Sequence, residues 1–195
     1  MELSKDPFEI IENWMQIAKD AGIPDHNAMA MATADANSIP NVRVVLLKEI
    51  DTRGLIFYTN YESIKGQELV SNQRAAIAIH WRTLKRQIRV RGDVEVLESE
   101  KSDLYFNSRP LGSRYSAWAS KQSQPLSSRE QFEAEIENIS QKYAQNPPRP
   151  KFWGGFRLKP FEIEFWKELD YRRHDRFRWT RVSPSSNWSV QRLYP

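Results

Sequence analysis

Three residues near the middle of the chain have the types and spacing of a phosphate-binding group. Tyr105, Arg109 and Ser113 stand four apart, so on one helix they share a face and place two hydroxyls beside a guanidinium. An arginine can bond two phosphate oxygens while hydroxyls bond a third. Pro110 disturbs this spacing, and the alternative is an exposed arginine beside a packed tyrosine. The spacing alone leaves both interpretations open.

A second cluster is the run Arg43 to Lys48, in which four apolar residues lie between two cations. Because both faces of the run are apolar, it is typical of a central barrel strand whose ends emerge at a pocket. At roughly 3.3 Å per residue its cations lie about 16 Å apart, which suits a ligand with charge at one end and a polarisable ring at the other. The alternative is two strand-end charges that reach solvent.

The densest cluster lies close to the C-terminus, where five arginines are interleaved with His174 and aromatic residues between positions 172 and 181. On a strand, one face of this segment would carry Arg172, His174, Arg176 and Arg178. Such a row repels itself unless an anionic ligand, nearby acids or a nucleic-acid backbone neutralises it. An ordinary strand histidine is the alternative for His174.

The sequence lacks the residues or motifs that several common types of catalytic and binding site require. The chain of 195 residues has no cysteine, which excludes disulfides, thiolate catalysis, iron–sulfur clusters and cysteine-ligated zinc. It has only seven glycines, none of them in a G-x-G-x-x-G or G-x-x-x-x-G-K loop. Its three histidines lie far apart, and no G-x-S-x-G motif supplies a serine nucleophile. Any phosphate must therefore be held by side chains, and hydrolase and metalloenzyme functions are disfavoured.

These clusters and further ordered motifs resemble the pyridoxine (pyridoxamine) 5′-phosphate oxidase family over nearly the whole chain. Matching motifs are Phe57 to Ser63, Ser108-Arg109-Pro110, Ala117 to Ser120, Pro148-Arg149-Pro150 and Trp153-Gly154-Gly155. The family signature follows as Ile163-Glu164-Phe165-Trp166 and then Arg172-x-His174-Asp175-Arg176. The resemblance implies an α+β, mainly β fold, the FMN-binding split β-barrel with peripheral helices, and a homodimer with two FMN molecules at the subunit interface.

The resemblance also assigns residues. The family's FMN contacts fall on Arg43, Val44, Val45, Leu46, Leu47, Lys48, Tyr58, Thr59, Lys65, Gln87, Gln122, Ser123, Trp166 and Arg176. Its substrate contacts fall on Lys48, Tyr105, Arg109, Ser113, Arg172 and His174. Within this set Arg172 and His174 are expected at the reacting carbon as the catalytic residues. Side-chain cations thus replace the missing glycine loop.

The activity that the resemblance implies is FMN-dependent oxidation of pyridoxine 5′-phosphate and pyridoxamine 5′-phosphate by O2 to pyridoxal 5′-phosphate, a step of vitamin B6 metabolism. Hydrogen peroxide is released, together with ammonia from the amine. One alternative is a split-barrel flavoprotein oxidase with another substrate, of the phenazine-pathway type, and the intact clamp and the Arg172-x-His174 pair argue against it. Another is a basic barrel that binds RNA or DNA. We expect phosphorylated B6 vitamers and O2 as partners, and neither nucleic acid nor a membrane.

Three positions depart from the family pattern, and one of them is Lys167, which follows the tryptophan where glutamine is common. Ile64 stands where many relatives carry arginine directly before the lysine of Lys65-Gly66, so we expect one contact to the FMN phosphate to be lost and flavin affinity to be lower. Arg173 stands between Arg172 and His174, where the family usually has an aliphatic residue. On a strand its side chain points away from theirs, and we expect it to face solvent or an acid.

The elements that must position these residues alternate between helical and strand patterns. Asp6-Pro7-Phe8-Glu9 begins an amphipathic helix that ends at Gly22. Short β-type runs separated by turn signals predict strands at 28–34, 42–48, 55–60, 75–81 and 87–97, with one helix at 63–70. Serine caps predict helices at 99–107 and 128–143, and strand patterns return at 156–158, 161–167, 177–182 and 188–193.

The length of 195 residues, with 39% hydrophobic residues and a net charge of +4, fits a single domain over 1–195. We expect an N-terminal helix over 6–22, main barrel strands over 28–97, a helical section over 99–146, and C-terminal strands over 152–195 that complete the barrel and the dimer interface. The C-terminal strands must rejoin the first sheet because alone they bury too small a core. The sequence shows no signal segment and no membrane span, so we expect a cytoplasmic protein.

Overall fold

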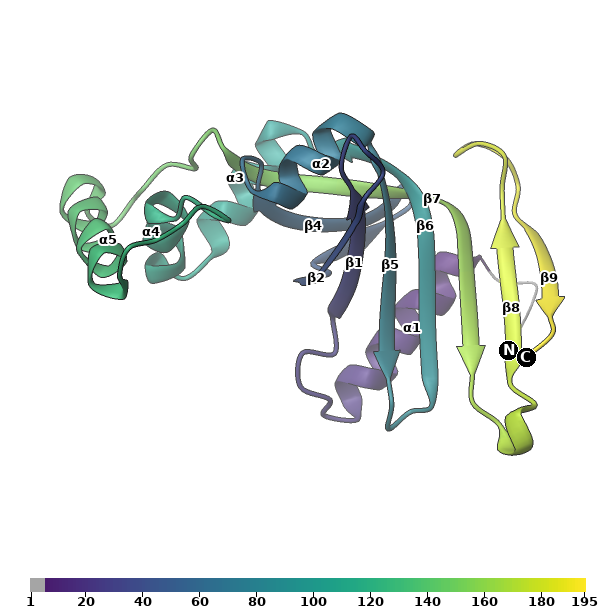
Figure 1. Cartoon of the computed structure of the whole chain (residues 1–195). Coiled ribbons are helices and arrows are strands. Elements are labelled where there is room, and N and C mark those ends of the chain that lie inside the picture. The colour runs from purple at the N-terminus through teal and green to yellow at the C-terminus, as the bar shows by residue number, and fades with distance from the viewer. Residues whose placement is uncertain (1–5) are drawn as a thin grey trace.

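The computed structural model describes residues 6–195, and a curled sheet forms the body of this region (Figure 1). Its strands are β1 (Ala28–Ala34), β2 (Pro40–Leu46), β3 (Glu49–Asp51), β4 (Gly54–Asn60), β5 (Arg74–Trp81), β6 (Arg86–Val96), β7 (Trp153–Lys167), β8 (Asp175–Thr180) and β9 (Ser189–Leu193). The helices are α1 (Pro7–Asp20), α2 (Ile64–Asn72), α3 (Ser99–Ser108), α4 (Leu111–Ala119) and α5 (Arg129–Tyr143), with a short 3-10 helix at Asp170–Arg172. The strand order is β2-β1-β5-β6-β7-β4-β3, and β8 and β9 extend from β7.

β7 joins the two parts of the sheet. It pairs with β6 along its length, with β4 through residues 153–158, and with β8 through residues 162–167. In Figure 1, β4 runs across the direction of β5 and β6 at one end of the molecule, while β8 and β9 lie at the other side. The C-terminal strands therefore rejoin the first sheet, as the sequence predicts, and the chain forms a mainly β fold with peripheral helices.

β7 changes partners at a bulge. The register with β6 slips between Arg91 and Gly92, so that Phe161 has no partner on β6. Pro160 offers no N–H to the ladder, which weakens pairing at this point. A Cβ atom on Gly92 would lie 2.2 Å from the carbonyl oxygen of Lys159, so only glycine permits the close approach of the two backbones. The segments predicted as two strands, 156–158 and 161–167, therefore belong to one strand that the bulge interrupts.

α1 packs on the sheet as its apolar spacing predicts. The Asp6 side chain accepts a hydrogen bond from the Phe8 N–H at 2.8 Å, and Pro7 occupies the first helical turn. Trp14 is buried, and its ring meets that of Phe165 edge to face with centroids 5.3 Å apart. The helix thereby covers β7 and closes the hydrophobic core.

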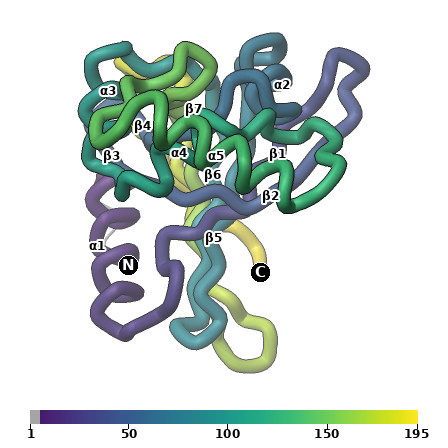
Figure 2. Tube along the Cα trace, turned by 90° about the vertical axis from the view of Figure 1, so that its left-hand side faces the viewer, coloured from purple at the N-terminus to yellow at the C-terminus, as the bar shows by residue number. Residues whose placement is uncertain are grey.

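Helices α3 to α5 lie together at the end of the molecule that is opposite β8 and β9, and Figure 2 shows this group turned by 90°. Ser128 caps α5 by accepting from the Gln131 N–H at 3.2 Å, as predicted. The predicted serine cap at Ser99 is wrong, because Glu98 stands at that position and makes no side-chain cap. No sequence pattern predicted α4 or the three-residue strand β3.

β2 is not the central strand that the sequence predicts for residues 42–48. It is an edge strand of the described sheet and pairs with β1. Its burial alternates, and Val42 and Val44 are 67% and 66% exposed on the outer side. Beyond the strand, the Lys48 N–H donates to the Ile56 carbonyl of β4 at 2.9 Å, which draws this part of the chain against the other end of the curl.

Candidate active site

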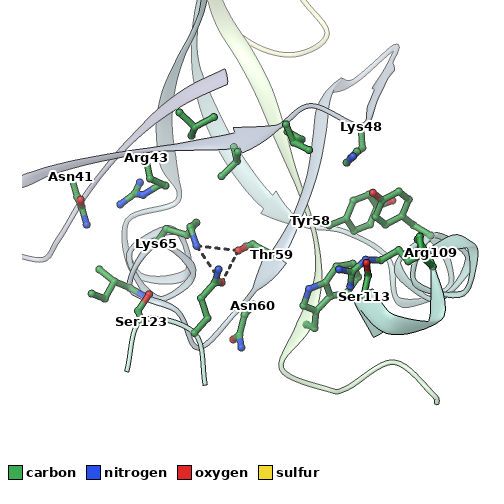
Figure 3. A pocket seen from close by; sticks show the side chains of 18 residues that line it. Asn41, Arg43, Lys48, Tyr58, Thr59, Asn60, Lys65, Arg109, Ser113 and Ser123 are labelled. Carbon is green, nitrogen blue, oxygen red and sulfur yellow. Dashed lines mark hydrogen bonds between the residues drawn. The ribbon is translucent and has the colours of Figure 1, made fainter. Parts of the chain in front are cut away.

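A cavity of about 720 Å³ opens between β2, β4, the start of α2 and the segment that joins α3 to α4 (Figure 3). It is lined by Asn41, Arg43, Val44, Val45, Leu46, Lys48, Tyr58, Thr59, Asn60, Ile64, Lys65, Tyr105, Arg109, Pro110, Ser113, Gln122, Ser123 and Trp153. Most residues that the sequence analysis assigned to flavin or substrate therefore share one cavity, although they come from five separate parts of the chain.

One end of the cavity carries Arg43 and Lys65 (Figure 3). The Lys65 side chain is almost fully buried, and its Nζ lies 3.3 Å from both Thr59 Oγ1 and Gln122 Oε1. Burial lowers the pKa of Lys65 below its usual range, and the charge of Arg43 acts in the same direction. Two cations at the same end of the cavity favour an anion between them.

The opposite end carries Lys48, Arg109 and Ser113 (Figure 3). The guanidinium of Arg109 lies 4.7 Å from the centre of the Trp153 ring, and its buried Nη1 has no hydrogen-bond partner among the described residues. Burial lowers the pKa of Arg109 below its usual range. A buried guanidinium N–H without an acceptor calls for a ligand oxygen, because leaving such a group unpaired is costly.

An aromatic stack supports this second end. The rings of Tyr58 and Tyr105 are parallel to within 12°, and their centroids lie 3.9 Å apart. Burial, aided by the nearby carboxylate of Glu49, raises the pKa of Tyr58 to about 12. Tyr58 therefore keeps its proton at neutral pH. Gly155 makes room for this ring, because a Cβ atom there would lie 2.9 Å from Tyr58 Cε1.

The helical face predicted for the phosphate clamp is wrong, although its three residues do meet at the cavity. Tyr105 belongs to α3, Arg109 follows the end of that helix, and Ser113 belongs to α4. Pro110 stands at the break, where its ring prevents α3 from continuing. The clamp is formed by two helices that meet at a corner, rather than by one helix.

Some residues that line the cavity were not expected at a ligand, and one expected residue lies elsewhere. The unexpected lining residues are Asn41, Asn60, Ile64, Pro110 and Trp153. For Asn41 a signal existed, because on a strand it shares a face with Arg43. Leu47, expected at the flavin, is buried in the core and does not line the cavity.

A second group of assigned residues lies elsewhere on the sheet. Gln87, Trp166 and Arg176 stand directly opposite one another on β6, β7 and β8, so they form one row across three strands. Arg176 donates from Nε to Glu164 Oε1 at 2.9 Å, and Arg89 pairs with the other oxygen of this carboxylate at 3.2 Å. None of the three residues of the row lines the cavity of the same chain.

Arg172 and His174 precede β8 and are not strand residues, so the two do not share a strand face with Arg176 and Arg178. Arg172 ends the 3-10 helix with a left-handed backbone, φ 59°, a costly conformation for a residue with a side chain. His174 Nδ1 accepts from the Leu169 N–H at 3.2 Å, which leaves Nε2 for other contacts. Arg173 is exposed, as expected, and its guanidinium lies 5.4 Å from the centre of the Tyr171 ring.

Comparisons with known proteins decide the family. A family model described as pyridoxamine 5′-phosphate oxidase matches residues 15–143, and one described as the pyridoxine 5′-phosphate oxidase C-terminal dimerisation region matches residues 153–195. The chain belongs to the pyridoxamine 5′-phosphate oxidase family. This membership confirms the split-barrel fold, FMN as the cofactor, oxidoreductase activity and the homodimer expected from the sequence.

Individual members of the family are similar to this chain over nearly its whole length. The chain is 52% identical to the pyridoxine/pyridoxamine 5′-phosphate oxidase of Cereibacter sphaeroides, covering 97% of this chain and 95% of the relative. It is 49% identical to the enzyme of that name from Brucella anthropi, covering 98% and 95%. It is also similar to the crystal structure of PhzG from Burkholderia lata in complex with tetrahydrophenazine-1-carboxylic acid, with a TM-score of 0.93 and 31% identity, covering 100% and 95%.

The dimerisation region contains most of the assigned residues that do not line the cavity. It spans β7 to β9 and includes Trp166, Arg172, His174 and Arg176. No helix among residues 6–195 is long and apolar enough to cross a membrane.

Proposed function

We propose that the chain oxidises pyridoxine 5′-phosphate and pyridoxamine 5′-phosphate to pyridoxal 5′-phosphate in the cytoplasm, with FMN as cofactor and O2 as the final electron acceptor. The observation that carries this proposal is a single cavity with a cationic group at each end. The reaction must bring together two molecules that each carry a phosphate, the flavin and the vitamer, and each phosphate needs its own cations. The cysteine-free composition suits a reducing compartment.

The residues at the first end fit the phosphate of FMN. Arg43 and Lys65 supply charge, Ser123 adds a hydroxyl, and β2 provides an apolar wall from Val44 to Leu46 for a flat ring. When bound, FMN supplies the hydride acceptor for the substrate carbon and is reoxidised by O2, which leaves as hydrogen peroxide. The protein orients the two molecules.

The residues at the second end fit the phosphate of the substrate. Lys48 and Arg109 supply charge, and Tyr105 and Ser113 supply hydroxyls. This anchor lies away from the carbon that reacts, so its binding energy serves to hold the vitamer ring in the transfer geometry. The unpaired Nη1 of Arg109 is the group in the cavity that gains most from a phosphate oxygen.

The two groups of residues combine in the homodimer. We place the row of Gln87, Trp166 and Arg176 from one copy against the cavity of the other, together with Arg172 and His174. Two observations support this arrangement: all but Gln87 lie in the dimerisation region, and the cavity wall β2 is an edge strand with an exposed apolar face. In this position Arg172 and the free Nε2 of His174 orient the reacting carbon over the flavin.

The similarity to PhzG raises the alternative of a tricyclic carboxylate as substrate. A carboxylate has two oxygens to fill, whereas the second end of the cavity offers four donor groups, which match the three terminal oxygens of a phosphate better. The higher identity to enzymes named for pyridoxine and pyridoxamine phosphates points the same way.

The visible spectrum of the FMN-loaded protein tests the proposal. Recorded without oxygen, the flavin band bleaches on addition of pyridoxine 5′-phosphate and returns on admission of air. Unphosphorylated pyridoxine at the same concentration is the control and leaves the band nearly unchanged. A yellow protein that is bleached by a tetrahydrophenazine carboxylate and not by the phosphate would refute the proposed substrate while retaining the cofactor.

A further inference from the structure

We infer that Glu68 is a positioning residue, which aims the guanidinium of Arg43 at the phosphate of the flavin. The inference rests on the proposed function and deepens it, because Glu68 does not itself line the cavity. It acts through Arg43, to which it is joined by an ion pair of 3.1 Å.

Glu68 is a buried carboxylate, and both of its oxygens accept hydrogen bonds from neighbouring side chains. It is 7% exposed on α2, one turn after Lys65. Oε2 accepts from the hydroxyl of Thr33 and from Arg43 Nη2, and Oε1 accepts from Asn41 Nδ2 at 3.2 Å. These donors come from β1 and β2, so the carboxylate joins α2 to the wall of the cavity. Burying a charge is costly unless it is paired in this way, which argues for a specific role.

Counting donors on Arg43 shows what this arrangement leaves free. The guanidinium has five N–H groups. Nη1 uses two of them, for the Met31 carbonyl at 3.2 Å and the Thr33 hydroxyl at 2.5 Å, and Nη2 uses one for Glu68. One N–H on Nε and one on Nη2 remain, which is the number that a bidentate arginine–phosphate pair requires. Glu68 and Thr33 therefore fix which edge of the guanidinium is offered to the cavity.

Glu68 also acts on the charge of its neighbours. Burial opposes its ionisation, but hydrogen bonds from Thr33 and Asn41 and the charge of Arg43 outweigh burial, so the pKa of Glu68 lies below its usual value. Its negative charge in turn raises the pKa of Lys65 against the effects of burial and Arg43. The same negative charge repels a phosphate. If Glu68 acts mainly by positioning Arg43, removing its carboxylate weakens FMN binding. If its charge acts mainly by repelling the phosphate, removing the carboxylate strengthens FMN binding, so the measured affinity distinguishes the two.

The experiment compares FMN with riboflavin, which lacks the phosphate, by calorimetric titration of the FMN-free protein. For Glu68→Ala we expect the Kd of FMN to rise by about tenfold, the value of one charge-assisted hydrogen bond, while the Kd of riboflavin stays within about twofold. Glu68→Gln keeps an acceptor for Arg43 and is expected to recover most of the loss. The matched control is Glu62→Gln, which removes an exposed carboxylate before α2 and leaves both affinities unchanged.

Three outcomes would overturn the inference. Equal weakening of FMN and riboflavin would make Glu68 a packing residue, and tighter binding of FMN by Glu68→Ala would show that charge outweighs positioning. An undiminished effect of Glu68→Ala in an Arg43→Ala background would show that Glu68 does not act through Arg43. If Glu68→Ala fails to fold, Thr33→Val removes the hydroxyl shared by both side chains, and an unchanged FMN to riboflavin ratio in that variant refutes the inference. A wild-type chain that binds neither flavin contradicts the proposed function instead.

Discussion

The cavity and the dimerisation region differ in whether contacts within a single chain hold their site residues in place. At the cavity, Lys65 is buried and bonded to Thr59 and Gln122, and Arg43 is held by Glu68 and Thr33. In the dimerisation region Arg172 is exposed and forms no ion pair with residues 6–195. The two cations proposed to bind the flavin phosphate are thus fixed within one chain, whereas Arg172, which we propose acts at the reacting carbon of the other copy's site, has no ion-pair partner among the described residues.

The largest expected effect comes from separating the two copies. Val42→Asp places a charge on the exposed apolar face of β2, outside the cavity lining. We expect a folded monomer whose turnover falls by about 100-fold, because the cavity loses the groups that orient the reacting carbon. Analytical ultracentrifugation and steady-state kinetics check this result. Leu104→Asp, at an exposed apolar residue of α3, is the matched control and should remain a fully active dimer.

Mixing two impaired variants, assayed at a substrate concentration at which each alone has little activity, tests which chain supplies which residue. Arg109→Ala should mainly raise the KM for phosphorylated substrates by about 10- to 100-fold, and Arg172→Ala should lower turnover and affinity together. In a mixed dimer one active site carries both changes and the other carries neither. Random exchange of subunits should therefore restore about one quarter of wild-type activity, as expected for a two-fold symmetric interface. No recovery on mixing would place both arginines in the same site of the same chain.

A smaller effect is expected from Ile64, which lines the cavity next to Lys65 and near Ser123, at the end proposed for the flavin phosphate. Ile64→Arg adds a third cation there and should tighten FMN by about three- to tenfold, with no change for riboflavin. Ile64→Gln is the neutral control of similar length. Titration of both flavins measures the effect, and a gain for riboflavin as large as for FMN would show that packing and not charge is responsible.

The smallest expected effect concerns stability in acid. Arg157 of β7 is almost fully buried and donates to Asp51 and Glu95 at 2.8 Å. Burial opposes ionisation of Glu95, but hydrogen bonds from Lys159 and Arg157 outweigh it and hold its pKa below the ordinary value of 4.5. Because the folded-state pKa is the lower one, the stabilisation is present above pH 4.5 and is lost as the pH falls below it. The Tm of the wild-type chain should fall more steeply below that pH than the Tm of Glu95→Gln, and parallel curves would contradict this.

Sequence patterns predicted the chemistry of the cavity better than its geometry. Arg109 and Ser113 were singled out by a helical spacing that Pro110 breaks, yet the corner between α3 and α4 brings them together. The apolar run after Arg43 predicts a central strand, but β2 is an edge strand, and the second copy that we propose to cover it would favour the same apolar composition as a protein core. The sequence of one chain does not distinguish burial in its own core from burial against a second subunit.

The positions of Arg172 and His174 were harder to predict for a different reason. Strand spacing assumes a regular backbone, and a left-handed turn at Tyr171 and Arg172 interrupts it. Neither residue is a glycine, so composition gives no signal for this turn. The family motif supplied the residues, and the tertiary structure supplied their placement.

The bulge at Phe161 determines which way β7 presents its side chains on either side of it. Before the bulge the even-numbered Phe156 and Leu158 face the core, and after it the odd-numbered Ile163 and Phe165 do so. Trp153 and Trp166 lie roughly 43 Å apart along an extended strand. Trp153 lines the cavity of its own chain, and we propose that Trp166 reaches the cavity of the second copy. An unbroken alternation that retained Phe161 would turn Trp166 inward and Ile163 outward, so the bulge, by absorbing this one residue, keeps Trp166 on the face from which we propose that it reaches the other active site.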